Sequence, residues 1–155
     1  MSVVIEERIK NIINDKDTIK VLATTDRDGI PHVVPKGSAR LLENGKIEVL
    51  ELIESSQTNK NLTASIWFDQ TVAFNFISKE KESFQIKGKV ERVIISGREF
   101  ERRYVELREH LGDVDLSGIW IIEPESVVEE TFKKRFAEEW TKHPEITHLD
   151  RIAKD

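Results

Sequence analysis

The stretch from Gly29 to Leu62, GIPHVVPKGSARLLENGKIEVLELIESSQTNKNL, decides the fold. It contains a β-type segment over 30–42, an Asn-Gly pair at 44–45, and a second β-type segment over 46–53. An Asn-Gly pair between two such segments is typical of a tight hairpin turn. A polar loop then leads into an apolar helical pattern. The stretch therefore predicts two strands and a helix, joined by short connections.

Two prolines, Pro31 and Pro35, lie in the first predicted strand. Because proline has no backbone N–H, it cannot donate a hydrogen bond to a neighbouring strand and is confined to sheet edges and bulges. The strand over 30–42 is therefore expected to have an open edge, a bulge or a ligand beside it.

The second predicted strand is apolar on both faces, and so is a later strand over 118–122. The interior of a small barrel accepts only one face of a strand. The other face then needs cover from a helix, a ligand or a partner subunit, and we therefore predict a homodimer. The alternating residues of the 46–53 strand are Ile47, Val49 and Ile53 on one face, and Leu50 and Leu52 on the other.

Four further strands and three further helices are predicted from hydrophobic periodicity. In the strand that contains Phe84, the alternation of apolar and polar residues shifts phase near Arg92, which indicates a bulge. Ser96 and Glu99 have the spacing of a capping box for the helix that follows. The further strands are 18–25, 71–77, 84–91 and 118–122, the last continuing to Val128, and the further helices are 5–13, 100–111 and 132–140.

Composition excludes several classes of function. The chain has 155 residues and a net charge of −5, which suits a single domain over 1–155. It has no long basic run, so general nucleic-acid binding is not expected, and its lack of cysteine excludes disulfides and thiolate sites. No membrane span, signal-peptide core or metal-ligand spacing is found. We therefore predict a cytoplasmic protein without a metal site.

The polar loop before Leu62 is the strongest candidate for a binding site. Ser55, Ser56 and Thr58 are residue types that cap helices, and the start of a helix offers free N–H groups and a positive dipole end to an anion such as phosphate. Lys36 or Lys60 would supply a cation. An ordinary capped helix, without a ligand, is the alternative interpretation.

Four pieces of this sequence together resemble the FMN-binding split-barrel family, the family of pyridoxamine 5′-phosphate oxidase and its smaller relatives. They are VLATT at 21–25, DRDGIPHVVP at 26–35, GKIEVLEL at 45–52, and the loop that ends T-x-x-N-L at 58–62. The resemblance covers roughly 19–92. It implies a mainly β protein with helices, folded as a six-stranded split β-barrel that binds FMN.

By this resemblance, the FMN phosphate lies on the 55–61 loop and the ring lies along 34–38 and 49–51. Gly37 permits close approach of the ring, although a strand bulge explains that glycine equally well. Trp120 corresponds to a late-strand aromatic that often covers the flavin from the partner subunit, although a core tryptophan is at least as common. The expected cofactor-binding residues are Val34, Pro35, Lys36, Gly37, Ser38, Leu50, Glu51, Ser55, Gln57, Thr58, Lys60, Asn61 and Trp120.

The resemblance also implies an activity. A small flavin-dependent oxidoreductase with a small-molecule electron donor or acceptor is expected, and no catalytic side chain is assigned. The basic residues that bind phosphate in the larger oxidases of the family are only partly present. The C-terminal Arg-Leu-x-Pro segment that holds pyridoxine phosphates is missing. Oxidation of those substrates is therefore not expected. The alternatives are a non-catalytic flavin carrier or redox sensor, and a split barrel that uses a deazaflavin or haem.

Overall fold

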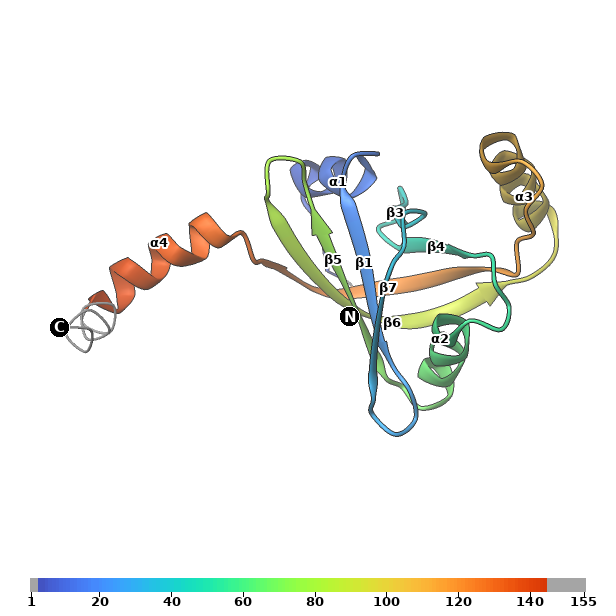
Figure 1. The fold of residues 1–155 in the computed structure, drawn as a ribbon, viewed down its shortest axis with the longest axis horizontal. Helices are drawn as coiled ribbons and strands as arrows, with labels where there is room; N and C mark the ends of the chain where they lie inside the picture. Colours follow the sequence, from blue (N-terminus) through green and yellow to red (C-terminus); the bar gives the residue numbers. More distant parts are fainter. Residues whose placement is uncertain (1–2, 145–155) are drawn as a thin grey trace.

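The computed structural model describes residues 3–144, which form four helices and a single antiparallel sheet of seven strands. The strand order is β2-β1-β5-β6-β7-β4-β3, and the sheet curls into an open barrel (Figure 1). The helices are α1 (Glu7–Asn14), α2 (Gln57–Trp67), α3 (Arg98–Leu111) and α4 (Phe132–Lys142). The strands are β1 (Ile19–Thr25), β2 (Pro31–Pro35), β3 (Arg40–Leu41), β4 (Ile47–Glu51), β5 (Thr71–Ile77), β6 (Ser83–Ile94) and β7 (Gly118–Glu129).

The single strand expected over 30–42 is two strands, which is why the sheet has seven strands and not six. β2 and β3 lie at opposite edges of the sheet. The Lys36 N–H donates to Lys20 O on β1, and the Ala39 N–H then closes a turn onto Lys36 O. Because this turn ends the pairing with β1, the chain leaves one sheet edge and continues at the other.

The long strands β6 and β7 bend the sheet into its barrel shape. Their pairing shifts register at Lys87/Gly88 and again between Val90 and Arg92, which confirms the predicted irregularity near Arg92. Gly88 lies so close to β7 that a Cβ built on it would be 2.3 Å from Glu123 O. Bulges of this kind increase strand bending and twist, so they help the sheet to close.

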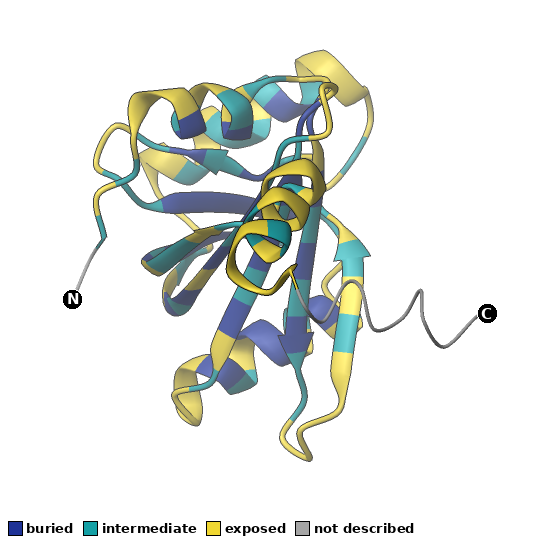
Figure 2. Cartoon of the chain, turned by 90° about the vertical axis from the view of Figure 1, so that its left-hand side faces the viewer, coloured by how far each residue is buried: buried dark blue, intermediate teal, exposed yellow. Residues whose placement is uncertain are grey.

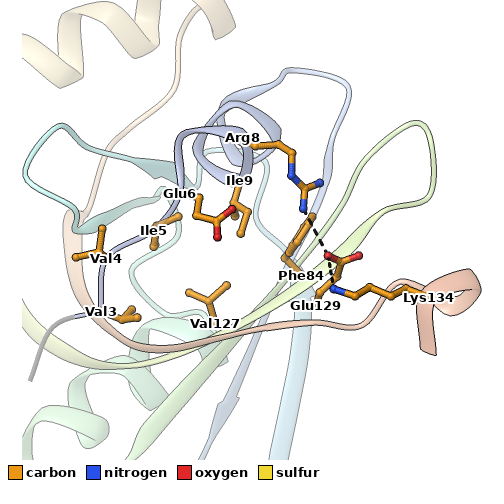
Figure 3. A pocket seen from close by; sticks show the side chains of 10 residues that line it. All are labelled: Val3, Val4, Ile5, Glu6, Arg8, Ile9, Phe84, Val127, Glu129 and Lys134. Carbon is orange, nitrogen blue, oxygen red and sulfur yellow. Dashed lines mark hydrogen bonds and ion pairs between the residues drawn. The ribbon is translucent and has the colours of Figure 1, made fainter. Parts of the chain in front are cut away.

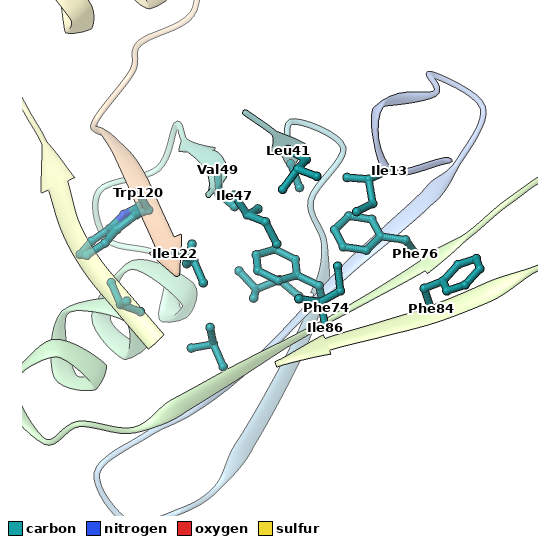
Figure 4. Close-up of a cluster of buried hydrophobic side chains, with 14 of the residues drawn as sticks. Ile13, Leu41, Ile47, Val49, Phe74, Phe76, Phe84, Ile86, Trp120 and Ile122 are labelled. Carbon is teal, nitrogen blue, oxygen red and sulfur yellow. The ribbon is translucent and has the colours of Figure 1, made fainter. Parts of the chain in front are cut away.

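The main core fills the barrel, and most of the strand residues that face inward are fully buried (Figure 2). Phe74 and Phe76 stack with their ring centroids 5.5 Å apart. Ile13 of α1 covers one end of this core (Figure 4) and Leu62 of α2 is also part of it. Both helices therefore bury their apolar sides against the barrel.

A second, smaller core lies between α3 and the outer face of the sheet, around Leu50 and Leu107. All five residues of β4 are buried, which confirms that this strand is covered on both faces, one of them by α3. The predicted capping box of α3 is wrong. The N-cap is Gly97, with φ of 94° and no side-chain cap, a backbone conformation that glycine adopts far more readily than Ser96 would.

The N-terminal segment packs along β6 and β7 beside α1 (Figure 3). It encloses a cavity of about 340 Å³. The Arg8 guanidinium lies 5.3 Å from the centroid of the Phe84 ring and pairs with Glu82 at 2.6 Å. This cavity lies away from the residues predicted to bind a cofactor, since none of them lines it.

The predicted C-terminal helix is confirmed as α4, which extends away from the barrel at the end of β7 (Figure 1). None of its residues is buried. Phe132 and Phe136 stack at 5.6 Å, and Trp140 contacts Phe136 edge-on. The aromatic residues at i, i+4 and i+8 therefore form one stripe on the helix.

Candidate functional site

The two edges of the sheet approach each other where the β2–β3 turn meets the end of β4. Lys36 Nζ lies 2.6 Å from Glu51 Oε2. Ser38 Oγ accepts a hydrogen bond from the Leu50 N–H at 3.1 Å and donates to Leu50 O at 3.2 Å. We call this region, residues 36–38 and 50–51, the split. Its two sides are joined by side chains, because β2 and β4 are not neighbours in the sheet.

The Lys36–Glu51 ion pair balances the charges at the split. The Glu51 side chain is 3% exposed and that of Lys36 is 15% exposed. The second carboxylate oxygen of Glu51 accepts a hydrogen bond from the Ile53 N–H at 3.1 Å. A buried carboxylate needs such partners. Lys36 was predicted to supply a positive charge to a bound phosphate, and in the structure this charge pairs with Glu51. The sequence placed both residues at the site but gave no sign that they pair.

The first turn of α2 is capped as the sequence predicts. Ser56 is the N-cap, and its Oγ accepts a hydrogen bond from the Asn59 N–H at 3.0 Å. Ser55 and Gln57 are exposed. Within residues 3–144, the N–H groups of Gln57 and Thr58 have no hydrogen-bond acceptor. The start of α2 therefore keeps two free donors and its positive dipole end.

Two of the predicted phosphate residues instead hold α2 against the barrel. Thr58 is 2% exposed and Asn61 is 1% exposed. Asn61 Nδ2 donates to Thr24 Oγ1 at 3.0 Å, and Asn61 Oδ1 accepts from Gln57 Nε2 at 2.7 Å. The side chains of Thr58 and Asn61 thus lie inside the protein, whereas those of Ser55, Gln57 and Lys60 are accessible.

A cavity of about 350 Å³, which we call the turn cavity, lies between α2 and the turn that joins β1 to β2. It brings together Arg27 and Lys60, both exposed. Neither residue has an ion-pair partner within the described part of the chain. Asp26 holds the turn, because its Oδ1 accepts from the Asp28 and Ile30 N–H groups. Two cations without ion pairs therefore lie beside the open first turn of α2, and the carboxylates of Asp26 and Asp28 line the same cavity.

A larger cavity of about 580 Å³, which we call the α3 cavity, lies between the split and α3. Gly37, Ser38 and Leu50 form its sheet side. A Cβ built on Gly37 would have no other atom within 4 Å, so this glycine borders open space. The α3 side consists of Arg103, Glu106, Leu107, His110 and Leu111.

Paired charges fix α3 to the sheet beside this cavity. Glu48 is 1% exposed, and its Oε1 accepts from the Nε atoms of Arg40 and Arg103, each at 2.9 Å. Arg103 also donates to Glu106, and that hydrogen bond lowers the pKa of the Glu106 carboxyl. The arginine is therefore shared between two carboxylates, and the wall of the cavity carries no free cation at this point.

Trp120 is 2% exposed and belongs to the main core. Its Nε1 donates to Asn59 Oδ1 at 3.0 Å, so the indole helps to position the start of α2. It also lines a third cavity, between α2 and α3. Trp120 is thus a core residue of this chain, and its predicted role in covering a flavin of a partner subunit remains a prediction.

Seven of the thirteen predicted residues line three different cavities, and the other six line none of the three. Gly37, Ser38 and Leu50 line the α3 cavity, Gln57, Lys60 and Asn61 line the turn cavity, and Trp120 lines the third. Val34 is half-buried and Pro35 exposed on the β2 edge. Neither Arg27 nor the residues of α3 were predicted as site residues. Arg27 lies in the Asp26–Gly29 turn. The sequence predicts this turn, but it does not show that the turn lies beside the start of α2. The α3 residues Arg103, Leu107 and His110 belong to a helix predicted only as amphipathic.

Comparison with known proteins identifies the fold. No protein-family model matches the chain, and no curated protein matches it. Among solved structures, HupZ of Group A Streptococcus has 22% sequence identity and a TM-score of 0.69, covering 83% of this chain and 96% of its own. An FMN-binding protein from Syntrophomonas wolfei has 14% identity and a TM-score of 0.68, covering 81% and 86%. HutZ, the haem storage protein of Vibrio cholerae, has 17% identity and a TM-score of 0.59, covering 82% and 95%.

The chain has the split-barrel fold of FMN-binding and pyridoxamine 5′-phosphate oxidase-like proteins, as the sequence resemblance predicts. Solved structures with this fold include an FMN-binding protein, an F420 reductase and a haem storage protein. Across residues 3–144, none of the helices has the length and apolar character needed to span a bilayer.

Proposed function

We propose that this split barrel binds FMN and acts as a small flavin-dependent oxidoreductase. The proposal includes a homodimer, a cytoplasmic location and a small-molecule electron donor or acceptor. When bound, FMN supplies the redox chemistry, and the protein binds and orients it. The chain's own contribution is therefore a phosphate site, an apolar site for the ring, and exclusion of water from the ring.

The phosphate site carries the proposal. Arg27 and Lys60 are free of ion pairs and lie on one cavity with the first turn of α2. In a chain of net charge −5, two cations without ion pairs on one cavity with unpaired helix N–H groups suit an anionic ligand, although the carboxylates of Asp26 and Asp28 line the same cavity. Arginine and backbone N–H donors both form charge-assisted hydrogen bonds to phosphate oxygens. Ser55 and Gln57 add exposed polar groups beside them.

The ring is proposed to lie toward the α3 cavity, which shares no lining residue with the turn cavity and adjoins the 36–38 segment predicted to lie along the ring. Its walls are mainly apolar, through Leu50, Leu107 and Leu111, and Gly37 leaves the backbone of the β2–β3 turn open. A cavity of about 580 Å³ is within the range that small-molecule cofactors occupy. Backbone groups of the turn would address the polar edge of the ring, and the apolar walls would exclude water from it.

Haem is the second candidate, on one specific observation. His110 lines the α3 cavity, and its Nδ1 lies 2.9 Å from Glu106 O. A backbone carbonyl on Nδ1 fixes the ring so that Nε2 is the free ligand nitrogen, an arrangement common among metal-binding histidines. A histidine of this kind on an apolar cavity would suit haem iron. The absorbance spectrum of the purified protein separates flavin bands from a Soret band.

The decisive test compares FMN with riboflavin, which lacks the phosphate. Replacing Arg27 and Lys60 by Gln is expected to weaken FMN binding by at least tenfold and to leave riboflavin binding unchanged. Lys79→Gln is the matched control, because Lys79 is an exposed lysine on the β5–β6 turn and lines none of these cavities. Equal losses for both ligands, or none, would show that the phosphate binds elsewhere.

A further inference from the structure

Helix α4 lies apart from both cores of the protein. It follows the end of β7 and extends away from the barrel (Figure 1), and none of its residues is buried. Phe132 is 74% exposed and Phe136 is 49% exposed, and their rings stack on one side of the helix with centroids 5.6 Å apart. An apolar stripe on one side of a helix is normally buried against another element. The stripe of α4 therefore indicates a contact with something other than the barrel of its own chain.

Charge is unevenly distributed along α4, because its basic residues, apart from Lys142 in the last turn, precede Phe136 and its acidic residues follow it. They are Lys133, Lys134, Arg135, Glu138 and Glu139. Since the N-terminal end of a helix is the positive end of its dipole, basic residues in the first turn destabilise the helix. A basic residue placed before an acidic one is also the weaker order for pairs four positions apart. The stability of α4 by itself therefore does not explain this order.

The ion pairs within the chain leave part of this charge unused. Lys134 and Arg135 lie 3.3 to 3.9 Å from neighbouring glutamates, and exposed pairs of this kind contribute little to stability. Within residues 3–144, Lys133 and Glu139 have no ion-pair partner. One positive charge in the first half of α4 and one negative charge in the second half thus remain available to another molecule.

A second copy of α4 that runs in the opposite direction complements both the stripe and the charges. In a two-fold symmetric contact, residue i of one copy meets residue j of the other, and j meets i. With Phe136 at the two-fold axis, Phe132 lies level with Trp140 of the other copy, and Lys133 lies level with its Glu139. The basic half of each helix thus lies beside the acidic half of the other. A parallel arrangement would place like charges together instead.

An anionic membrane surface is a poorer partner for the same stripe. Glu139 follows Phe136 by three positions and therefore lies beside it on the helix surface. A stripe inserted among anionic headgroups would bring this carboxylate next to like charges, whereas helices that bind such surfaces have lysine and arginine on their polar face. The charges of α4 therefore favour a second copy of the chain.

From these features we propose that α4 packs antiparallel against α4 of a second copy, with the two aromatic stripes facing each other and Phe136 near the two-fold axis. No α4 residue lines the turn cavity or the α3 cavity, so the contact is independent of FMN. Four phenylalanine side chains at about 150 Å² each bury roughly 600 Å² at most, and a stable interface buries about 1,200 Å² or more. The contact therefore needs further surface between the same two copies, and in this respect it rests on the proposed homodimer.

The test uses disulfide formation in the full, ligand-free chain. The chain has no cysteine, so a single introduced cysteine can form a disulfide only with another copy. Phe136→Cys is expected to form a disulfide-linked dimer at least tenfold faster than Thr141→Cys, the matched control at an exposed α4 position on another side of the helix. Phe132→Cys and Trp140→Cys are each expected to react slowly alone and rapidly when mixed, since the antiparallel register places these two positions level. Non-reducing electrophoresis during oxidation measures the rates.

A second measurement removes the stripe. Phe132→Ser combined with Phe136→Ser is expected to weaken self-association at least tenfold in light scattering over a concentration series. The thermal midpoint should stay unchanged, because no α4 residue is buried.

Three results would overturn the proposal. A dimer mass in light scattering, with Phe136→Cys reacting no faster than Thr141→Cys, would refute the α4 contact and leave the proposed homodimer standing. Phe132→Cys alone reacting as fast as its mixture with Trp140→Cys would show a parallel pair. Binding to vesicles of phosphatidylcholine and phosphatidylglycerol that the double serine variant loses, without any change in mass, would make the partner of α4 a membrane.

Discussion

Replacing Gln57 by Glu tests the phosphate site with little disturbance to the fold. Gln57 is the first residue of α2 and is exposed beside the turn cavity. The substitution keeps the size of the side chain and adds one negative charge. If a phosphate dianion lies about 6 Å from that carboxylate in nearly water-like surroundings, the repulsion is about 1.5 kcal/mol. FMN affinity should therefore fall roughly tenfold.

The same substitution should leave the free energy of unfolding nearly unchanged. A carboxylate in the first turn of a helix is stabilised by about 0.3–1 kcal/mol through the dipole. Gln57 Nε2 now donates to Asn61 Oδ1, and Asn61 Nδ2 donates to Thr24. If the Asn61 amide rotates by half a turn, its NH₂ donates to the new carboxylate and its oxygen accepts from the Thr24 hydroxyl, so both hydrogen bonds are kept.

FMN titrations followed by flavin fluorescence, together with urea unfolding, measure both quantities. Gln85→Glu is the matched control, because Gln85 lies on β6 and lines none of the three cavities. Raising the salt concentration should reduce the effect of Gln57→Glu, since the charges are near solvent. An unchanged FMN affinity in a folded Gln57→Glu variant would refute the placement of the phosphate at α2.

Three further predictions concern stability. Lys36→Met should lower the free energy of unfolding by about 3 kcal/mol, because it leaves the buried Glu51 carboxylate without its cation; Lys36→Met combined with Glu51→Leu should recover most of this loss in urea unfolding. Burial lowers the pKa of Lys20, so the unfolded state binds more protons between that pKa and the ordinary one, and stability due to Lys20 rises with pH in that window. The free energy of unfolding of the unmodified protein, measured relative to that of Lys20→Met, should therefore rise as the pH approaches 10.5. Gly88→Ala should cost about 2–3 kcal/mol, since its Cβ would meet Glu123 O at 2.3 Å, and a thermal midpoint equal to that of the unmodified protein would contradict the close packing of β6 on β7.

The strands and helices were predictable where periodicity determines them. β4 is apolar on both faces in the sequence and buried on both faces in the structure. The division of the segment over 30–42 was not predictable, because a β-type run does not reveal which partner each half pairs with. Pro35 indicated an interruption of the hydrogen bonds to a neighbouring strand, but a sheet edge, a bulge and a ligand were equally consistent with it. Pairing partners are set by contacts between residues far apart in sequence, and these decide where the barrel opens.

The candidate site was predictable in position and less so in detail. The start of α2 and its Ser56 cap follow from local residue types. Whether a polar side chain of that turn faces solvent or the barrel depends on how α2 is rotated, so Thr58 and Asn61 could not be separated from Ser55 by sequence. The pairing of Lys36 with Glu51 joins two residues 15 positions apart in the sequence, one in the β2–β3 turn and one at the end of β4, and no local pattern encodes it.

The edge of the sheet at β2 has a consequence for assembly. Lys36 directs its N–H inward, to Lys20 O of β1, and N–H groups alternate sides along a strand. The outward row therefore belongs to Pro31, Val33 and Pro35, and only Val33 has a hydrogen to donate. The opposite edge, β3, is two residues long. Neither edge can accept a long additional strand, so the proposed homodimer is expected to form through faces or helices and not by continuing the sheet.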